Sequence, residues 1–225
     1  MASERCYVLI PGAGGVPWHW HRVAAELRRH GHDVVDVDLP NDDPAAGLAE
    51  YADAVVRAAR GRTGAASSPI RWAGSPRRWC AGGYRWSGWC WWRRCRRRPA
   101  RHRASGGRTP ATARRRPSGS GWTVALRTDA LFYHDVPPEP AAEARSRERA
   151  QSGGPFGRPW PLVRRPETPA SFPLCRDDRF PPAAWLRGLV RERLGTEPEE
   201  RDGGHVPLLS RPRELAERVM RLSGG

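Results

Sequence analysis

The chain has 225 residues, enough for one domain with a sizeable core, and a net charge of +15 from 39 basic and 24 acidic residues. All of that excess lies between Arg62 and Trp122, where 16 arginines occur without an Asp or Glu, so the rest of the chain (23 arginines against 24 acidic residues) is near neutral. Met1 to Ile10 lacks the pattern of a secretory signal, and no window is long and apolar enough to span a membrane. These features argue against a membrane protein, and we expect a cytoplasmic one.

The N-terminal third has the periodicity of an α/β protein. Residues 7–10 form an apolar run that predicts a buried parallel strand, and a glycine-rich turn follows it. A helical pattern then starts at Trp18 and ends at Gly31, the residue type that commonly terminates a helix. Residues 34–39 predict a second strand and residues 48–59 a second amphipathic helix. This order predicts a doubly wound, mostly parallel sheet.

The C-terminal part continues the same pattern. Residues 140–151 predict an exposed helix, residues 171–175 a weak strand interrupted by Pro173, and residues 183–194 an amphipathic helix. A last helix is predicted to begin near Ser210, with Pro212 in its first turn.

The segment from Arg62 to Trp122 differs from everything around it. It has no Leu or Val, and it holds seven of the 11 tryptophans. So little aliphatic area cannot offset the entropy cost of ordering the chain, and we expect a disordered segment inside a single domain of residues 1–225. The three cysteines within it match no common zinc spacing, so no metal and no cofactor is expected.

The glycine-rich turn at residues 11–15 has three interpretations. A dinucleotide loop would require a glycine where Pro17 stands, although Asp36 or Asp38 lies at about the right distance for a ribose ligand. An oxyanion loop would direct the N–H of Ala13 toward a developing alkoxide. The third interpretation is an ordinary tight turn between a strand and a helix.

Asp178 and His205 are the strongest candidates for catalysis. Asp178 follows a predicted strand, and His205 follows two glycines before the last helix, so both are predicted near the carboxyl edge of the sheet, where open α/β folds place their active sites. The order of acid before histidine, with a nucleophile expected earlier, is the order of the α/β-hydrolase triad.

Four stretches together carry a family resemblance: LIPGAGGVPWHWHRVAAELRRHGHDVVDVDLP, LFYHDVPPE, CRDDRFPP and GGHVPLLSRPRELAE. They resemble the α/β-hydrolase superfamily, and within it the plant methylesterases, hydroxynitrile lyases and their bacterial esterase-like relatives, over most of residues 5–60 and 130–222. The resemblance implies that Asp178 is the triad acid, His205 the general base and Ala13 an oxyanion donor, and that residues 132–138 belong to a cap. The family's G-x-S-x-G elbow is absent from the chain, and Gly74-Ser75-Pro76 is its nearest remnant.

A displaced reading frame accounts for the missing elbow. Trp has the single codon TGG and Cys has TGT or TGC, so the run from Trp89 to Trp92, read from each third codon base, necessarily yields Val-Leu-Val. That product is a buried strand. The same register across Gly74-Ser75-Pro76 permits Gly-Gln-Ser-Pro, which resembles the start of a nucleophile elbow. We therefore hypothesise two compensating frameshifts, near Gly61 and before Asp129.

The favoured function is hydrolysis of a small-molecule carboxylic ester by a serine-hydrolase scaffold, impaired in this chain because its nucleophile is missing. Two alternatives remain at this point. An Arg/Trp-rich protein could bind RNA or single-stranded DNA through phosphate contacts and stacking, without sequence specificity. A nucleotide-binding α/β enzyme would use the glycine-rich turn.

Overall fold

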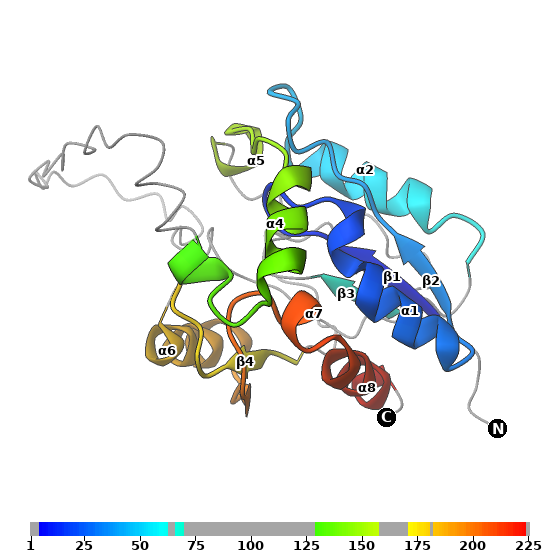
Figure 1. Cartoon of the computed structure of the whole chain (residues 1–225). Helices are drawn as coiled ribbons and strands as arrows, with labels where there is room; N and C mark the ends of the chain where they lie inside the picture. The colour runs from blue at the N-terminus through cyan, green and yellow to red at the C-terminus, as the bar shows by residue number, and fades with distance from the viewer. Residues whose placement is uncertain (1–4, 63–65, 70–128, 158–170, 181, 224–225) are drawn as a thin grey trace, which may run out of the picture.

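The computed structural model describes residues 5–62, 66–69, 129–157, 171–180 and 182–223 (Figure 1). Three parallel strands form the first sheet, in the order β2-β1-β3. They are β1 (Cys6–Ile10), β2 (Asp33–Asp36) and β3 (Ala66–Pro69). The strand expected at residues 34–39 is therefore shorter and begins one residue earlier, although Val37 still donates its N–H to the Leu9 carbonyl at 3.0 Å.

Strand β1 is buried on both faces, as its unbroken apolar run predicts. Alternate side chains enter two separate cores. Tyr7 and Leu9 pack with the helices on one face, while Val8 and Ile10 pack against α2 (Leu48–Ala58) on the other. This central position makes β1 the scaffold of the turn that follows it.

The helices cover both faces of this sheet. The turn after β1 leads into a short 3-10 helix, η1 (Pro17–Trp20), and then α1 (His21–Arg29), which packs beside the C-terminal helix α8 (Pro212–Ser223). Helices α1, α4 (Pro138–Arg147) and α8 lie on one side in Figure 1, with α2 on the other. Gly31 has a φ of 80° and follows the end of α1, which confirms the predicted helix stop.

A second parallel sheet pairs β4 (Pro173–Cys175) with β5 (Glu199–Arg201). Helix α6 (Ala183–Leu194) connects the two strands, packs against β4, and has the bounds that its periodicity predicts. After β5 come the short helix α7 (Pro207–Ser210) and then α8. The remaining short helix is α5 (Gly154–Gly157). Because β4 and β5 are parallel, their carboxyl ends lie at one edge of the sheet.

Two sequence expectations in the C-terminal part were wrong. The helix expected to be exposed at residues 140–151 is α4, which begins two residues earlier, ends at Arg147 and buries Pro140, Ala141 and Ala144. These small side chains give almost no periodic signal, yet they allow α4 to approach the core closely. Strand β5 was expected to be a link, because Glu-Glu-Arg has no apolar residue.

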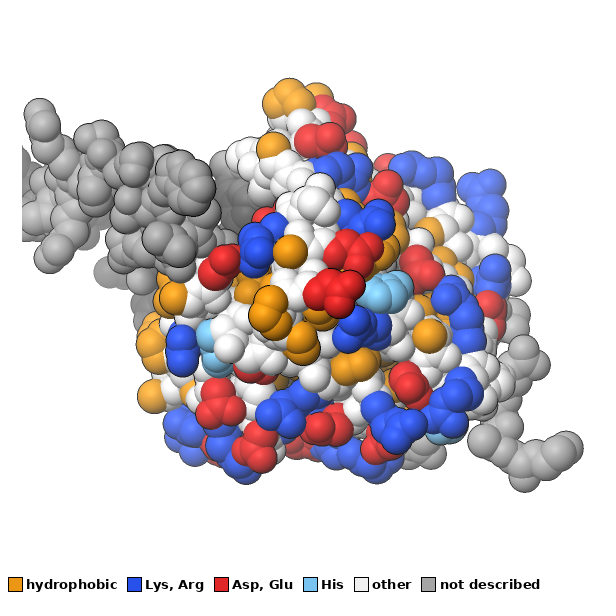
Figure 2. Space-filling model, in the orientation of Figure 1, with side chains coloured by type: hydrophobic (Ala, Val, Ile, Leu, Met, Phe, Trp, Pro, Cys, Tyr) orange, Lys and Arg blue, Asp and Glu red, His pale blue; other side chains and the backbone are white. Residues whose placement is uncertain are grey.

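Side chains of both charge signs are interspersed on the face of the molecule in Figure 2. Several arginines of the described surface form ion pairs, among them Arg28 with Asp36 at 2.9 Å and Arg145 with Asp129 at 2.8 Å. No helix within the described ranges is both long enough and apolar enough to span a membrane.

Candidate active site

Asp178 and His205 lie on neighbouring loops, one after β4 and one after β5. The His205 Nδ1 is 2.9 Å from the Asp178 Oδ1. The two side chains are 13% and 4% exposed, so the pair is largely shielded from water. The structure therefore brings together the acid and the histidine that the sequence selected, at the carboxyl edge of the strands.

The environment of Asp178 determines which nitrogen of His205 carries a proton. The Asp178 Oδ1 also accepts the N–H of Phe180 at 2.9 Å, which holds the carboxylate in place. An ionised carboxylate only accepts hydrogen bonds, so the His205 Nδ1 must donate. The neutral imidazole then keeps its lone pair on Nε2, the arrangement that a general base requires.

Aromatic side chains form a wall beside His205. The Phe132 ring lies 4.3 Å from the imidazole centroid in an edge-on arrangement, and Phe180 lies 6.4 Å away. Phe132 and Phe180 also contact each other edge to face, with centroids 5.3 Å apart. Residues 132–138, assigned to a cap by the family resemblance, thus supply one wall of the histidine site.

The glycine-rich turn after β1 is held by side chains from two other segments. Gly14 has a φ of 72°, and its N–H donates to Gln151 Oε1 at 3.1 Å. The Asn41 side chain donates to the Gly15 carbonyl at 2.7 Å. Ala13 is exposed at the tip of this turn. Helix α7, which begins two residues after His205, packs against η1, so the turn and the histidine loop belong to the same region of the fold.

Three titratable groups around this region have displaced pKa values. Burial lowers the pKa of His19, in η1. Burial also raises the pKa of Tyr51, an effect that the hydrogen bond with Gln151 partly offsets. Burial raises the pKa of Tyr133 far above its ordinary range, and the hydrogen bond from its hydroxyl to Glu148 raises it further. All three side chains are therefore neutral near pH 7.

The acids that a dinucleotide loop would use are paired with arginines. Asp36 accepts from Arg28 at 2.9 Å, and Asp38 forms an ion pair with Arg149. Pro17 begins η1 at the place where the dinucleotide motif needs a glycine. These contacts favour the oxyanion interpretation of the turn over the dinucleotide one.

The candidate nucleophile segment, with Gly74-Ser75-Pro76 and the three cysteines near it, lies outside the described residues. Among the residues that are described, no cluster of three or more His, Cys, Asp or Glu side chains has the arrangement of a metal site.

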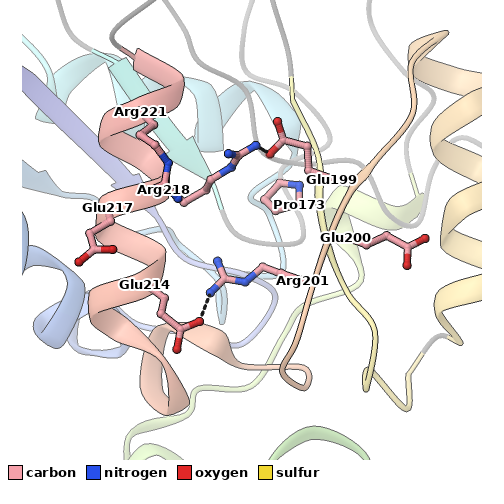
Figure 3. Close-up of a pocket in the computed structure, with 8 residues that line it drawn as sticks. All are labelled: Pro173, Glu199, Glu200, Arg201, Glu214, Glu217, Arg218 and Arg221. Atoms are coloured by element: carbon pink, nitrogen blue, oxygen red, sulfur yellow. Dashed lines mark hydrogen bonds and ion pairs between the residues drawn. The ribbon is translucent and has the colours of Figure 1, made fainter.

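A hollow of about 360 Å³ lies away from Asp178 and His205, between the start of the β4–β5 sheet and α8 (Figure 3). Its lining is mostly charged, and two of its arginines are already paired: Arg201 with Glu214 at 3.5 Å and Arg218 with Glu199. Open α/β folds bind ligands at the carboxyl ends of their strands, and this hollow is at the amino ends. We therefore interpret it as a salt-bridged groove.

Sequence reasoning missed the residues that support the site. Asn41 and Gln151 hold the glycine-rich turn, and Asp135 accepts the N–H of Gly204, next to His205, at 2.6 Å. No motif marks these three side chains, because each acts on a backbone group far away in the sequence. Only their position inside the segments that resemble the family singled out their neighbourhood.

No family model and no curated protein matches the chain. Solved structures do match it along almost its whole length. A methylesterase from Arabidopsis superposes with a TM-score of 0.72 at 14% identity, covering 96% of this chain and 97% of its own. A pyrethroid hydrolase from Sphingobium faniae JZ-2 gives 0.70 at 21% identity, with 98% of both chains covered.

An extracellular alpha/beta-hydrolase from a Paenibacillus species also matches, with a TM-score of 0.63 at 13% identity and 98% of both chains covered. Identities this low establish the architecture and leave the reaction open. They confirm the fold expected from the sequence. The chain has the α/β-hydrolase fold.

Proposed function

We propose that this chain is a serine-hydrolase scaffold whose parent reaction is hydrolysis of a carboxylic ester or a related small molecule, built as one domain over residues 1–225. The observation that carries the proposal is the shielded pair of Asp178 and His205, with 2.9 Å between Oδ1 and Nδ1 on the loops after two parallel strands. A methylesterase and a pyrethroid hydrolase among the matched structures support ester substrates.

Each residue has a defined role in the proposed reaction. The His205 Nε2 takes the proton of a serine hydroxyl as that oxygen attacks the ester carbonyl. Asp178 holds the imidazole in the required tautomer and stabilises the imidazolium that forms. The N–H of Ala13 donates to the developing oxyanion, and His205 then returns the proton to the departing alkoxide. Phe132 keeps water away from the imidazole and so strengthens these electrostatic contacts.

The serine itself is the missing part of the chain as written. Restoring the register between Gly61 and Asp129 is proposed to yield a Leu/Val-rich strand, a serine in a strand-to-helix elbow, and a second strand containing Val-Leu-Val. Both products are what the centre of an α/β-hydrolase sheet requires. The chain as written keeps the acid and base but has lost the nucleophile, and members of a triad act as a unit.

Labelling with a fluorophosphonate probe tests the proposal. The restored chain should react at the new serine, and His205→Ala should slow that reaction by orders of magnitude. The chain as written should show no labelling that depends on His205. A restored chain that folds but takes no label would overturn the proposal, as would coding DNA whose alternate register contains stop codons.

A further inference from the structure

Three consecutive residues of the histidine loop are each bound by a different carboxylate. The N–H of Gly203 donates to Asp177 Oδ2 at 3.0 Å, and the N–H of Gly204 donates to Asp135 Oδ2 at 2.6 Å. His205 itself is bound through its ring to Asp178. Two of these acids come from the loop after β4, whereas Asp135 comes from the cap segment, 69 residues away from Gly204 along the chain.

Asp135 grips the loop at both ends. In addition to the Gly204 N–H, its Oδ2 accepts the hydroxyl of Ser210 at 3.0 Å, on the far side of His205. The contact is too close for any side chain at position 204: a Cβ there would lie 2.4 Å from the Asp135 Oδ1 and 2.7 Å from the His134 Nε2. A glycine before the histidine is therefore a requirement of this contact.

The segment that carries Asp135 is anchored firmly. Tyr133 and Val136 on either side of it are buried in the core beneath α1 and α8. A short bond from a backbone N–H to a carboxylate is stronger than a bond between neutral groups. Asp135 is thus a charged acceptor on a rigid support, one residue from the side chain whose position the proposed chemistry depends on.

We propose that Asp135 is a positioning residue for His205: through the Gly204 N–H and the Ser210 hydroxyl it fixes the loop so that the imidazole stays on Asp178. This inference rests on the proposed function, because it concerns the histidine of that same site. It also gives the cap segment a second role, since any displacement of Asp135 moves the backbone next to His205.

The test uses the full chain labelled with ¹⁵N-histidine and ¹⁵N-glycine, and follows the His205 Nδ1–H and Gly204 amide resonances. Asp135→Ala should speed exchange of both protons with water by about tenfold or more, the effect of losing a hydrogen bond to a charged acceptor. Asp135→Asn keeps an acceptor but loses the charge, so both rates should lie between those of the wild type and Asp135→Ala. Asp129→Asn, which removes a carboxylate bound to Arg145 in the same segment, should leave both resonances unchanged.

Wild-type exchange rates in a folded Asp135→Ala variant would overturn the positioning role. If that variant does not fold, Asp135→Asn decides: a Gly204 amide unchanged in shift and exchange would equally overturn it. Loss of the two resonances in Asp129→Asn as well would reduce Asp135 to a general stability effect and contradict the inference. A wild-type chain whose His205 Nδ1–H does not depend on Asp178 would instead count against the proposed function, so the two failures are distinguishable.

Discussion

Replacing Asn41 by alanine is the perturbation that most clearly tests how the glycine-rich turn is held. The Asn41 side chain is fully buried. It donates to the Gly15 carbonyl at 2.7 Å and accepts the Tyr51 hydroxyl at 3.0 Å. Gln151 extends the network by donating to the Tyr51 oxygen at 3.1 Å and accepting the Gly14 N–H. One substitution therefore removes two bonds at the centre of a connected network.

The expected loss of stability follows from those two bonds. Each buried polar group that loses its partner costs about 1–3 kcal/mol, so Asn41→Ala should lower the free energy of unfolding by about 2–4 kcal/mol. That is a large share of a total stability of about 5–15 kcal/mol. Tyr51→Phe removes only the hydroxyl and should cost about 1–2 kcal/mol, and the double variant should cost less than the sum of the two.

Urea denaturation followed by circular dichroism measures all three variants. Asp42→Ala, at the exposed neighbouring position, is the matched control and should change the free energy by no more than about 0.5 kcal/mol. An Asn41→Ala variant as stable as this control, or strict additivity with Tyr51→Phe, would refute the argument that this network holds the turn.

Three further outcomes are expected. Gly204→Ala should destabilise the protein by about 1–3 kcal/mol because its Cβ would collide with Asp135, whereas Gly188→Ala in α6, where nothing lies within 4 Å, should stabilise it by about 0.5–1 kcal/mol; urea denaturation compares them, and equal effects would contradict the collision. The folded state holds the Tyr133 proton more tightly than the unfolded state, so the stability from this group is present below its ordinary pKa of 10.0 and is lost as the pH rises above it; a Tyr133→Phe variant that loses stability just as steeply in alkali would oppose this. Any binding to single-stranded nucleic acid should fall steeply with salt and disappear when residues 62–122 are deleted, and affinity that persists at high salt would indicate a dedicated binding module.

Local patterns were sufficient where a side chain's role is set by its own element. The apolar run of β1, the spacing of α6 and the glycine after α1 predicted those elements well. Asp178 and His205 were also found from the sequence alone, because both follow strand or loop signals in the order of a known triad. Their 2.9 Å contact was implied by the topology, since parallel neighbouring strands end at the same edge.

Local patterns failed where tertiary contacts decide. Glu199–Arg201 pairs with β4 as a strand although all three residues are charged, because only β4 tells it to be extended. Helix α4 is buried through alanine and proline, which carry little periodic signal. Asp135 and Asn41 bind backbone groups of distant segments, so no spacing within the sequence could have identified them.

The central claim is that Asp178 and His205 are the acid and base of an ester hydrolase whose nucleophile is hidden in a displaced reading frame. Turnover of a short p-nitrophenyl ester by the chain with its register restored between Gly61 and Asp129 tests it most directly. The account predicts hydrolysis that falls by several orders of magnitude in both His205→Ala and a variant of the new serine, with little turnover by the chain as written. Equal turnover in the restored chain and its His205→Ala variant, or His205-dependent turnover by the chain as written, would contradict it.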